Sequence, residues 1–88
     1  MAKPKARRLE AIAWRDHCSY SAPGWKSLED INELAPMTII TVGFVVKETP
    51  DHVNLCCSID AKDYSFAGDF CIIKSTIVKR WRLKSPIA

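Results

Sequence analysis

Several sequence patterns that would identify an activity are missing from this chain. It has no glycine-rich phosphate-binding loop, no nucleophile motif and no metal-ligand spacing of cysteines or histidines. Adjacent Cys56 and Cys57 would point to opposite faces of a strand, so we expect the four cysteines to be reduced and mostly buried. The sequence therefore predicts no metal site and no cofactor.

Residues suited to acid–base or nucleophilic chemistry are few. His17 stands between Asp16 and Cys18, and His52 follows Asp51. A nucleophile needs a base within hydrogen-bond reach and a third group that orients the base, which neighbours on opposite faces of a strand do not supply. We therefore expect a protein that is not an enzyme.

Long apolar runs are also missing. The longest candidate is interrupted by Thr41, Gly43 and Lys47, whereas a membrane span needs about 20 consecutive apolar residues. The start, MAKPKARR, is charged but is not followed by the apolar segment of a secretory signal. These features predict a protein that avoids membranes and works in a cytoplasm.

The length of 88 residues allows one domain with one small core. The content of 48% hydrophobic and 26% charged residues is typical of a folded protein. We expect a flexible basic arm at 1–8 and a single domain at 9–85. Because a core this small leaves apolar surface uncovered, self-association is expected to add stability.

The alternation of apolar and polar residues predicts five strands, at 9–17, 37–47, 53–59, 66–73 and 77–83. The segment 37–59 reads as one long hairpin. We expect its core residues to include Val42, Phe44, Val53, Leu55 and Cys57. A second apolar face with Ile39 and Val45 is left for another element or another chain to cover.

A short helix is predicted between the first two strands. Ser27 and Asp30 have the spacing of a capping box, and Leu28, Ile31 and Leu34 would share one face. Residues 74–76 are suited to a single 3₁₀ turn before the last strand. This pattern predicts a mainly β fold, a small five-stranded SH3-like or Sm-like barrel with one short helix, with an open α+β meander as the alternative.

Several motifs resemble a family of short bacteriophage and prophage proteins. They are a W-x-D start at Trp14, a G-W pair at Gly24, a "vGwvvketdd" hairpin from Val42, and an "IPKs-I" ending from Ile72. The resemblance covers about residues 13–83, with Phe44 in place of a tryptophan and Ile73 in place of the proline. It implies a phage source and a host bacterial cytoplasm, but no activity.

The aromatic residues Trp14, Tyr20 and Trp25 surround a loop rich in turn-forming residues. Aromatic side chains on a loop that a rigid scaffold positions are common in recognition surfaces. We expect them to bind a protein or a ligand. With the lack of a catalytic constellation, this favours a non-enzymatic binding module that self-associates and engages a host protein or a nucleotide-type ligand. The resemblance to phage proteins implies that it is a phage accessory protein, for example an inhibitor of a host defence.

The ends of the chain are basic and the middle is acidic. Residues 1–8 and 74–84 contain nine lysines and arginines and no acid. If both ends lie on one side, they would form a patch that attracts phosphate. The alternative function is therefore a nucleic-acid-binding accessory protein that uses Arg7, Arg8, Arg80 and Arg82.

Overall fold

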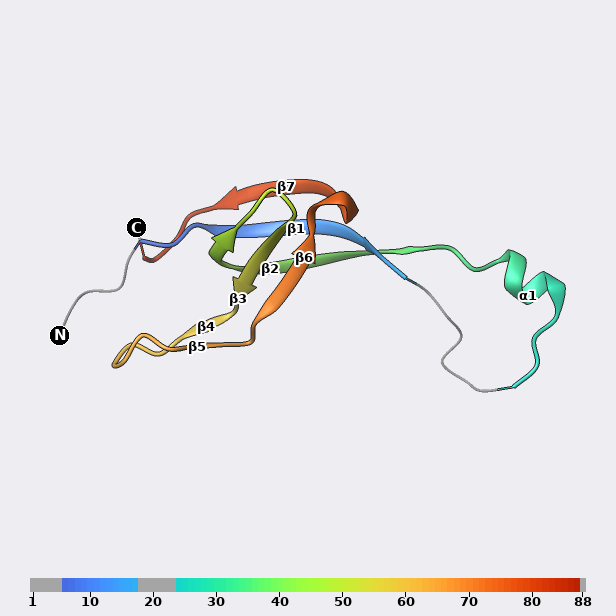
Figure 1. Cartoon of the computed structure of the whole chain (residues 1–88), viewed down its shortest axis with the longest axis horizontal. Helices are drawn as coiled ribbons and strands as arrows, with labels where there is room; N and C mark the ends of the chain where they lie inside the picture. The colour runs from blue at the N-terminus through green and yellow to red at the C-terminus, as the bar shows by residue number, and fades with distance from the viewer. Residues whose placement is uncertain (1–5, 18–23, 88) are drawn as a thin grey trace.

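The computed structural model describes residues 6–17 and 24–87. Within these ranges the chain is mainly β (Figure 1). The elements, in chain order, are β1 (Leu9–Asp16), α1 (Leu28–Asn32), β2 (Met37–Glu48), β3 (His52–Cys56), β4 (Ser58–Ile59), β5 (Phe66–Ala67), β6 (Phe70–Ile73), the 3₁₀ helix η1 (Lys74–Thr76) and β7 (Ile77–Leu83). The strands predicted at the start, in the hairpin and at the end of the sequence are confirmed.

Five of the strands form one antiparallel sheet in the order β6-β3-β2-β1-β7. The β1–β2 ladder runs without a register shift from Leu9 opposite Phe44 to Asp16 opposite Met37. β7 pairs with the other side of β1, so β1 lies between β2 and β7 in the sheet. Residues from both ends of the sequence therefore meet on neighbouring strands.

The expected closed barrel is not formed. β6 and β7 are the two edges of the sheet, and no strand ladder joins them among the described residues. Only the three residues of η1 separate these edges along the chain, so the sheet must curl strongly at that end. The observed fold is an open sheet, yet the return of β7 beside β1 also distinguishes it from a simple meander.

The core lies on the inner face of the sheet, which we define as the face that Ile12 occupies. Five aliphatic side chains from four strands form it, with Trp14 and Ile77 packed against them: Ile12, Val45, Val53, Leu55 and Ile72. Val53 and Leu55 were expected in the core, and this is confirmed. Burying each such side chain contributes about 1.5–3 kcal/mol. Because this cluster holds only five of them, the core is small for a chain of this length.

The prediction of which β2 residues face the core is wrong. Val42 is 51% exposed, Phe44 is half-buried, and Val45, expected on the uncovered face, is in the core. The β1–β2 register places Ile12 directly opposite Thr41, and residues opposite each other in a ladder share a face. Thr41 therefore faces inward, and Val42 faces outward.

Two contacts explain why a threonine and a glycine occupy the inner face of β2. The Trp14 indole Nε1 donates a hydrogen bond of 2.9 Å to Thr41 Oγ1, which satisfies both polar groups. A Cβ atom on Gly43 would lie 2.8 Å from the Cys56 carbonyl oxygen. Only a residue without a side chain lets β3 come so near.

Two predicted strands are each interrupted once. Cys57 was expected to point into the core, but it is exposed and lies between β3 and β4, while Cys56 is 1% exposed. The Cys57 amide donates to the carbonyl oxygens of Ala67 and Gly68, at 3.3 and 3.2 Å. Gly68 has a φ of +69°, a conformation that favours glycine. The chain turns out of the main sheet here, and β4 pairs with β5 as a separate two-stranded ribbon.

We predict that Ile12→Ala lowers the free energy of unfolding by about 2–5 kcal/mol, because it leaves a cavity at the centre of the core. Ile73→Ala is the matched control, since Ile73 is 53% exposed on β6. It should cost no more than about 0.5 kcal/mol. Urea denaturation at one fixed protein concentration measures both values, and equal losses would contradict the position of the core.

Candidate binding surfaces

A projection, residues 24–36, extends far from the sheet and carries α1 near its tip (Figure 1). Its apolar side chains are uncovered: Trp25 is 102% exposed, Leu28 74% and Ile31 49%. The expected capping box is confirmed, because the Ser27 hydroxyl accepts from the Asp30 amide and the Asp30 carboxylate accepts from the Ser27 amide, both at 3.1 Å. The helix therefore begins where the sequence predicts, but nothing in the described chain buries its apolar side.

The β1–β2 ladder explains why α1 does not cover its own sheet. The last pair of this ladder joins Asp16 and Met37, so the chain leaves the sheet at its end and continues away from it (Figure 1). The molecule measures 59 × 24 × 21 Å. Its radius of gyration is 17.2 Å, whereas a compact domain of this length has about 12 Å. The projection accounts for this elongation.

The outer face of the sheet, opposite the core, carries a second uncovered apolar surface. The registers place Val42 and Trp81 on either side of Ala11, and Ile40 two residues from Val42 on the same face. We call Ile40, Val42, Trp81 and Leu83 the outer strip; their exposed fractions run from 36% to 62%. The small side chain of Ala11 between Val42 and Trp81 leaves these large side chains accessible. The sequence indicated an uncovered face on β2 but assigned the wrong residues to it.

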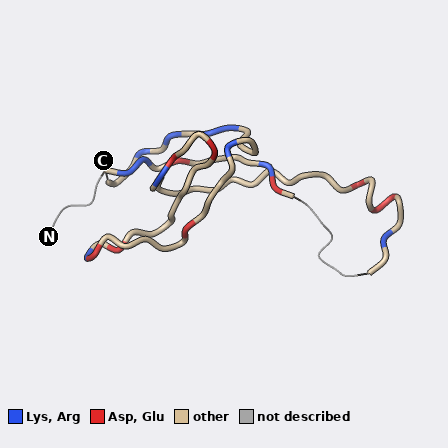
Figure 2. Tube along the Cα trace, in the orientation of Figure 1, with Lys and Arg blue, Asp and Glu red and all other residues tan. Residues whose placement is uncertain are grey.

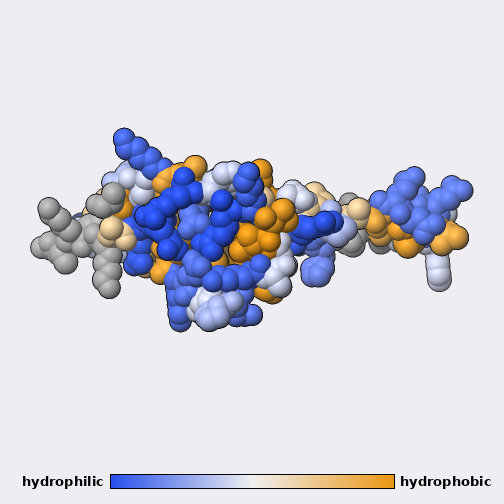
Figure 3. All heavy atoms as spheres, turned by 90° about the horizontal axis from the view of Figure 1, so that it is seen from above, coloured by the Kyte–Doolittle hydropathy of each residue, from blue (hydrophilic) through white to orange (hydrophobic). Residues whose placement is uncertain are grey.

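Basic side chains frame the outer strip. The Lys79 ammonium lies 5.0 Å from the centroid of the Trp81 ring, and Lys79 and Lys84 are both exposed. In the view from above, hydrophilic atoms gather over the middle of the sheet with hydrophobic atoms beside them, and hydrophobic atoms reach the surface again at the tip of the projection (Figure 3). The Lys79 ammonium therefore places a positive charge beside the apolar side chains of the outer strip.

An ion-pair cluster joins several elements on the inner face of the sheet, where Glu10 and Arg80 lie with Ile12. Its members are Arg8, Glu10, Glu48, Lys74 and Arg80. Glu10 is 6% exposed and accepts hydrogen bonds from Arg80 Nε at 2.8 Å and Nη2 at 3.0 Å. Glu48 accepts from Arg80 Nη2 at 2.9 Å and from Arg8 Nη2 at 2.7 Å, and pairs with Lys74 Nζ at 2.8 Å. Burying Glu10 is tolerable because its charge is fully paired.

The cluster shifts the titration of two of its members. Hydrogen bonds from Arg80 and then Lys74 hold the pKa of the Glu48 carboxyl well below its ordinary value. Hydrogen bonds to Glu48 and Glu10 raise the pKa of Arg80 above its ordinary value. Both shifts favour the charged forms, so the cluster is a stable clamp between β1, β2, η1 and β7.

The cluster changes the interpretation of the four arginines that were expected to contact nucleic acid. The charges of Arg8 and Arg80 are compensated by Glu10 and Glu48. Arg7 Nη1 donates to the Val46 carbonyl at 3.2 Å, and its guanidinium lies 5.5 Å from the Phe66 ring centroid. Arg82 is exposed on the edge strand. The Arg7 amide donates to the Ile87 carbonyl oxygen at 2.8 Å, so the two basic ends do lie together (Figure 2).

The three aromatic residues expected to form one recognition surface are separated. Trp14 is half-buried on the inner face, with its ring centroid 5.5 Å from that of Phe70. Trp25 lies on the projection, fully exposed. Tyr20 lies outside the described residues. Trp14 is therefore part of the packing around the core, and Trp25 is the one of the two that is open to a partner.

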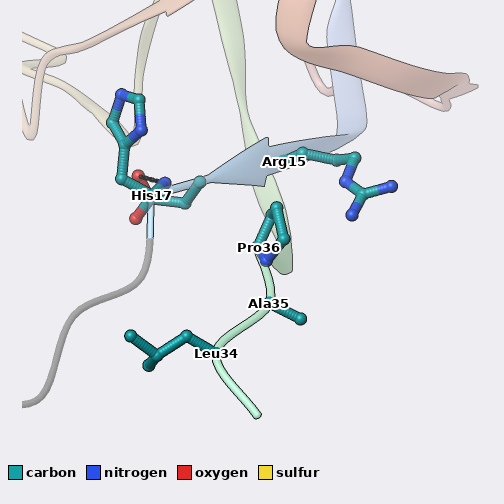
Figure 4. Close-up of a pocket in the computed structure, with 6 residues that line it drawn as sticks. Arg15, His17, Leu34, Ala35 and Pro36 are labelled. Atoms are coloured by element: carbon teal, nitrogen blue, oxygen red, sulfur yellow. Dashed lines mark hydrogen bonds between the residues drawn. The ribbon is translucent and has the colours of Figure 1, made fainter. Parts of the chain in front are cut away.

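A hollow of about 390 Å³ lies where the projection joins the sheet; it is lined by Arg15, Asp16, His17, Leu34, Ala35 and Pro36. The Arg15 and His17 side chains extend away from each other, and the His17 amide donates to the Asp16 carboxylate at 2.8 Å (Figure 4). Cys18, which follows, is outside the described residues. The histidine that the sequence singled out thus lies beside an open hollow at the base of the projection.

A second hollow, also of about 390 Å³, lies beside β3 and β6. Two phenylalanines, Phe66 and Phe70, line it together with Asn54, Asp69 and Cys71. Aromatic surfaces next to an amide and a carboxylate can contact the face and the edge of a planar ring. No local sequence pattern indicates this hollow, because its residues come from three separate segments.

Comparison with known proteins assigns no family to this chain: no family model, no curated protein and no solved structure matches it. Within 6–17 and 24–87, none of the helices has the length and apolar character needed to cross a membrane. In the same ranges, histidine, cysteine and acidic side chains do not come together in threes as a metal site would need. Functional inference therefore starts from the two uncovered apolar surfaces.

We predict that Glu48→Gln makes stability less dependent on pH in acid. Because the folded-state pKa of Glu48 is depressed, its carboxylate stabilises the fold above the ordinary pKa, and this contribution is lost as the pH falls below about 5. Urea denaturation between pH 7 and pH 3 should show a smaller loss for Glu48→Gln than for the wild type. Asp69→Asn, at an exposed carboxylate outside the cluster, is the control and should keep the wild-type slope.

Proposed function

We propose that this protein is a non-enzymatic binding module that self-associates through uncovered apolar surfaces and engages a host protein or a nucleotide-type ligand. The observation that carries the proposal is the combination of a small core with two exposed apolar surfaces, the projection and the outer strip. Contiguous apolar surface on a folded domain is typical of a site that another molecule covers.

The amount of uncovered surface supports self-association. The chain exposes 6766 Å², which is about 1,500 Å² more than a compact monomer of this mass exposes. A standard protein–protein interface buries about 800 Å² on each partner. The excess is therefore large enough for one such interface on each copy.

The proposal includes a source and a fold relationship. The motifs that resemble phage and prophage proteins support a phage accessory protein that acts in the host bacterial cytoplasm. The strand order, with η1 alone between the two edge strands, supports an opened relative of an SH3-like or Sm-like barrel. Small barrels of this kind carry their function on surfaces rather than in the fold itself.

The hollow beside β3 and β6 supports a nucleotide-type ligand as the small-molecule partner. Phe66 and Phe70 offer apolar ring faces, and Asn54 and Asp69 offer hydrogen-bonding groups for the edge of a base. The Arg7 guanidinium close to Phe66 adds a positive charge for a phosphate. These features make a nucleotide the ligand class that this surface fits best.

We predict that the apparent mass of the protein rises from that of a monomer toward that of a dimer as concentration increases from micromolar to millimolar. Val42→Glu should weaken this association about tenfold or more, because it places a charge in the outer strip. Ile73→Glu, at an equally exposed position on the edge strand β6, should leave the association unchanged. Multi-angle light scattering measures all three, and a strict monomer at every concentration would remove self-association from the proposal.

The second candidate function is nucleic-acid binding by β7. The observation that favours it is the set of exposed basic residues on and after this edge strand, Lys79, Arg82 and Lys84, of which Lys79 lies over the Trp81 ring. Cations beside an exposed aromatic ring can contact phosphates while a base stacks on the ring. Arg8 and Arg80 contribute less than the sequence indicated, because two carboxylates compensate them.

If β7 binds nucleic acid, Arg82→Ala should weaken binding to a single-stranded oligonucleotide and reduce the slope of log K against log salt by about one. Arg8→Ala should change the slope less than Arg82→Ala, because the Arg8 guanidinium is held in ion pairs with Glu10 and Glu48. Fluorescence anisotropy over a range of salt concentrations measures the slopes. Absence of binding at low salt would eliminate this candidate.

A further inference from the structure

We propose that α1 of one copy packs on the outer strip of a second copy, and that the partner's α1 packs reciprocally on the outer strip of the first. This rests on the proposed self-association and names the two surfaces that meet. The result is a dimer in which each copy extends its projection, residues 24–36, across the other.

Both surfaces lack a partner among the described residues of one chain. Leu28 and Ile31 on α1 are 74% and 49% exposed, and Ile40 and Val42 on the outer strip are 62% and 51% exposed. The β1–β2 ladder directs the projection away from its own sheet, so α1 does not reach the outer strip of the same copy. A second copy supplies each surface with the other.

The charges of the two surfaces are complementary. α1 and its C-cap carry exposed Glu29 and Glu33 beside the apolar residues. The ammonium group of exposed Lys79 lies over Trp81 of the outer strip, and exposed Lys84 directly follows Leu83 in the sequence. An apolar centre with charges of opposite sign at its rim is the arrangement that fixes orientation in protein interfaces. The same charges oppose the packing of two outer strips directly against each other.

The spacing along the chain fits a two-fold axis near Met37. Asn32, the last residue of α1, precedes Met37 by five residues, and Val42 follows it by five. An extended chain covers at most about 17 Å in five residues. In a dimer whose two-fold axis passes near Met37, the β2 strands of the two copies run in opposite directions. α1 of one copy then lies at the level of Val42 in the other.

The first experiment is zero-length carbodiimide cross-linking of a mixture of ¹⁴N- and ¹⁵N-labelled protein, followed by peptide mass spectrometry. Carbodiimide joins a carboxylate to an amine only where the two are in contact. We expect mixed-isotope cross-links between Glu29 or Glu33 and Lys79 or Lys84. A dimer whose intermolecular cross-links leave out these pairs would overturn the proposed contact while leaving self-association intact.

The second experiment exchanges the charges. Glu29→Lys with Glu33→Lys should weaken self-association about tenfold, and so should Lys79→Glu with Lys84→Glu. A mixture of the two variants should recover wild-type affinity as a heterodimer, because each helix then meets a strip of opposite charge. Thermal denaturation of each variant verifies that it is folded.

The outcomes separate the two proposals. Wild-type protein that stays monomeric overturns both self-association and the contact between α1 and the outer strip. Wild-type protein that associates, but whose charge variants show no loss or whose mixture shows no recovery, overturns only the contact between α1 and the outer strip. Weaker self-association of each variant, together with recovered affinity in the mixture, supports the contact between α1 and the outer strip.

Discussion

The pairing of β1 with β2 is the constraint on which the rest of the structure depends. Its register places Ile12 opposite Thr41, which decides that the core forms on that face and that Ile40 and Val42 face outward. Because the ladder runs to the end of both strands at Asp16 and Met37, it also directs the projection away from the sheet. One set of backbone hydrogen bonds thus determines the position of the core, the outer strip and α1 together.

The ion-pair cluster performs a complementary role at the edge of the sheet. β7 joins β1 late in the sequence, and Arg80 on β7 contacts Glu10 on β1 and Glu48 on β2 at the same time. Loss of the Arg80 contacts would remove two hydrogen bonds from buried Glu10 and leave Arg8 as its only cationic partner among the described residues, which is costly, so the cluster also disfavours other registers of β7. Charges that in the sequence look available for phosphate are used to align strands.

Much of the local structure could be predicted from the sequence. The alternation at Val53 and Leu55 predicted a buried strand, and Ser27 and Asp30 predicted the start of α1. These features depend on residues that are neighbours in the sequence. They can therefore be recognised from the sequence alone.

What failed depended on contacts between distant segments. Both faces of β2 are apolar, so its period of two does not distinguish Val42 from Val45, and only the pairing with Ile12 decides between them. The separation of Trp14 from Trp25 could not be foreseen, because it depends on the pairing that places Trp14 on the inner face and on the path of the projection. The ion pairs of Arg80 with Glu10 join residues 70 positions apart, and no local pattern announces them.

The size of the chain connects these observations. Five buried aliphatic residues provide a modest stabilisation, and the conformational entropy that folding must overcome grows with every ordered residue of the projection. An isolated helix of five residues is marginal in water, even with a capping box, since nucleation of so short a helix is unfavourable. A surface that covers the apolar side of α1 would stabilise so short a helix, and in the proposed dimer the apolar outer strip of a second copy, with Lys79 beside it, is that surface.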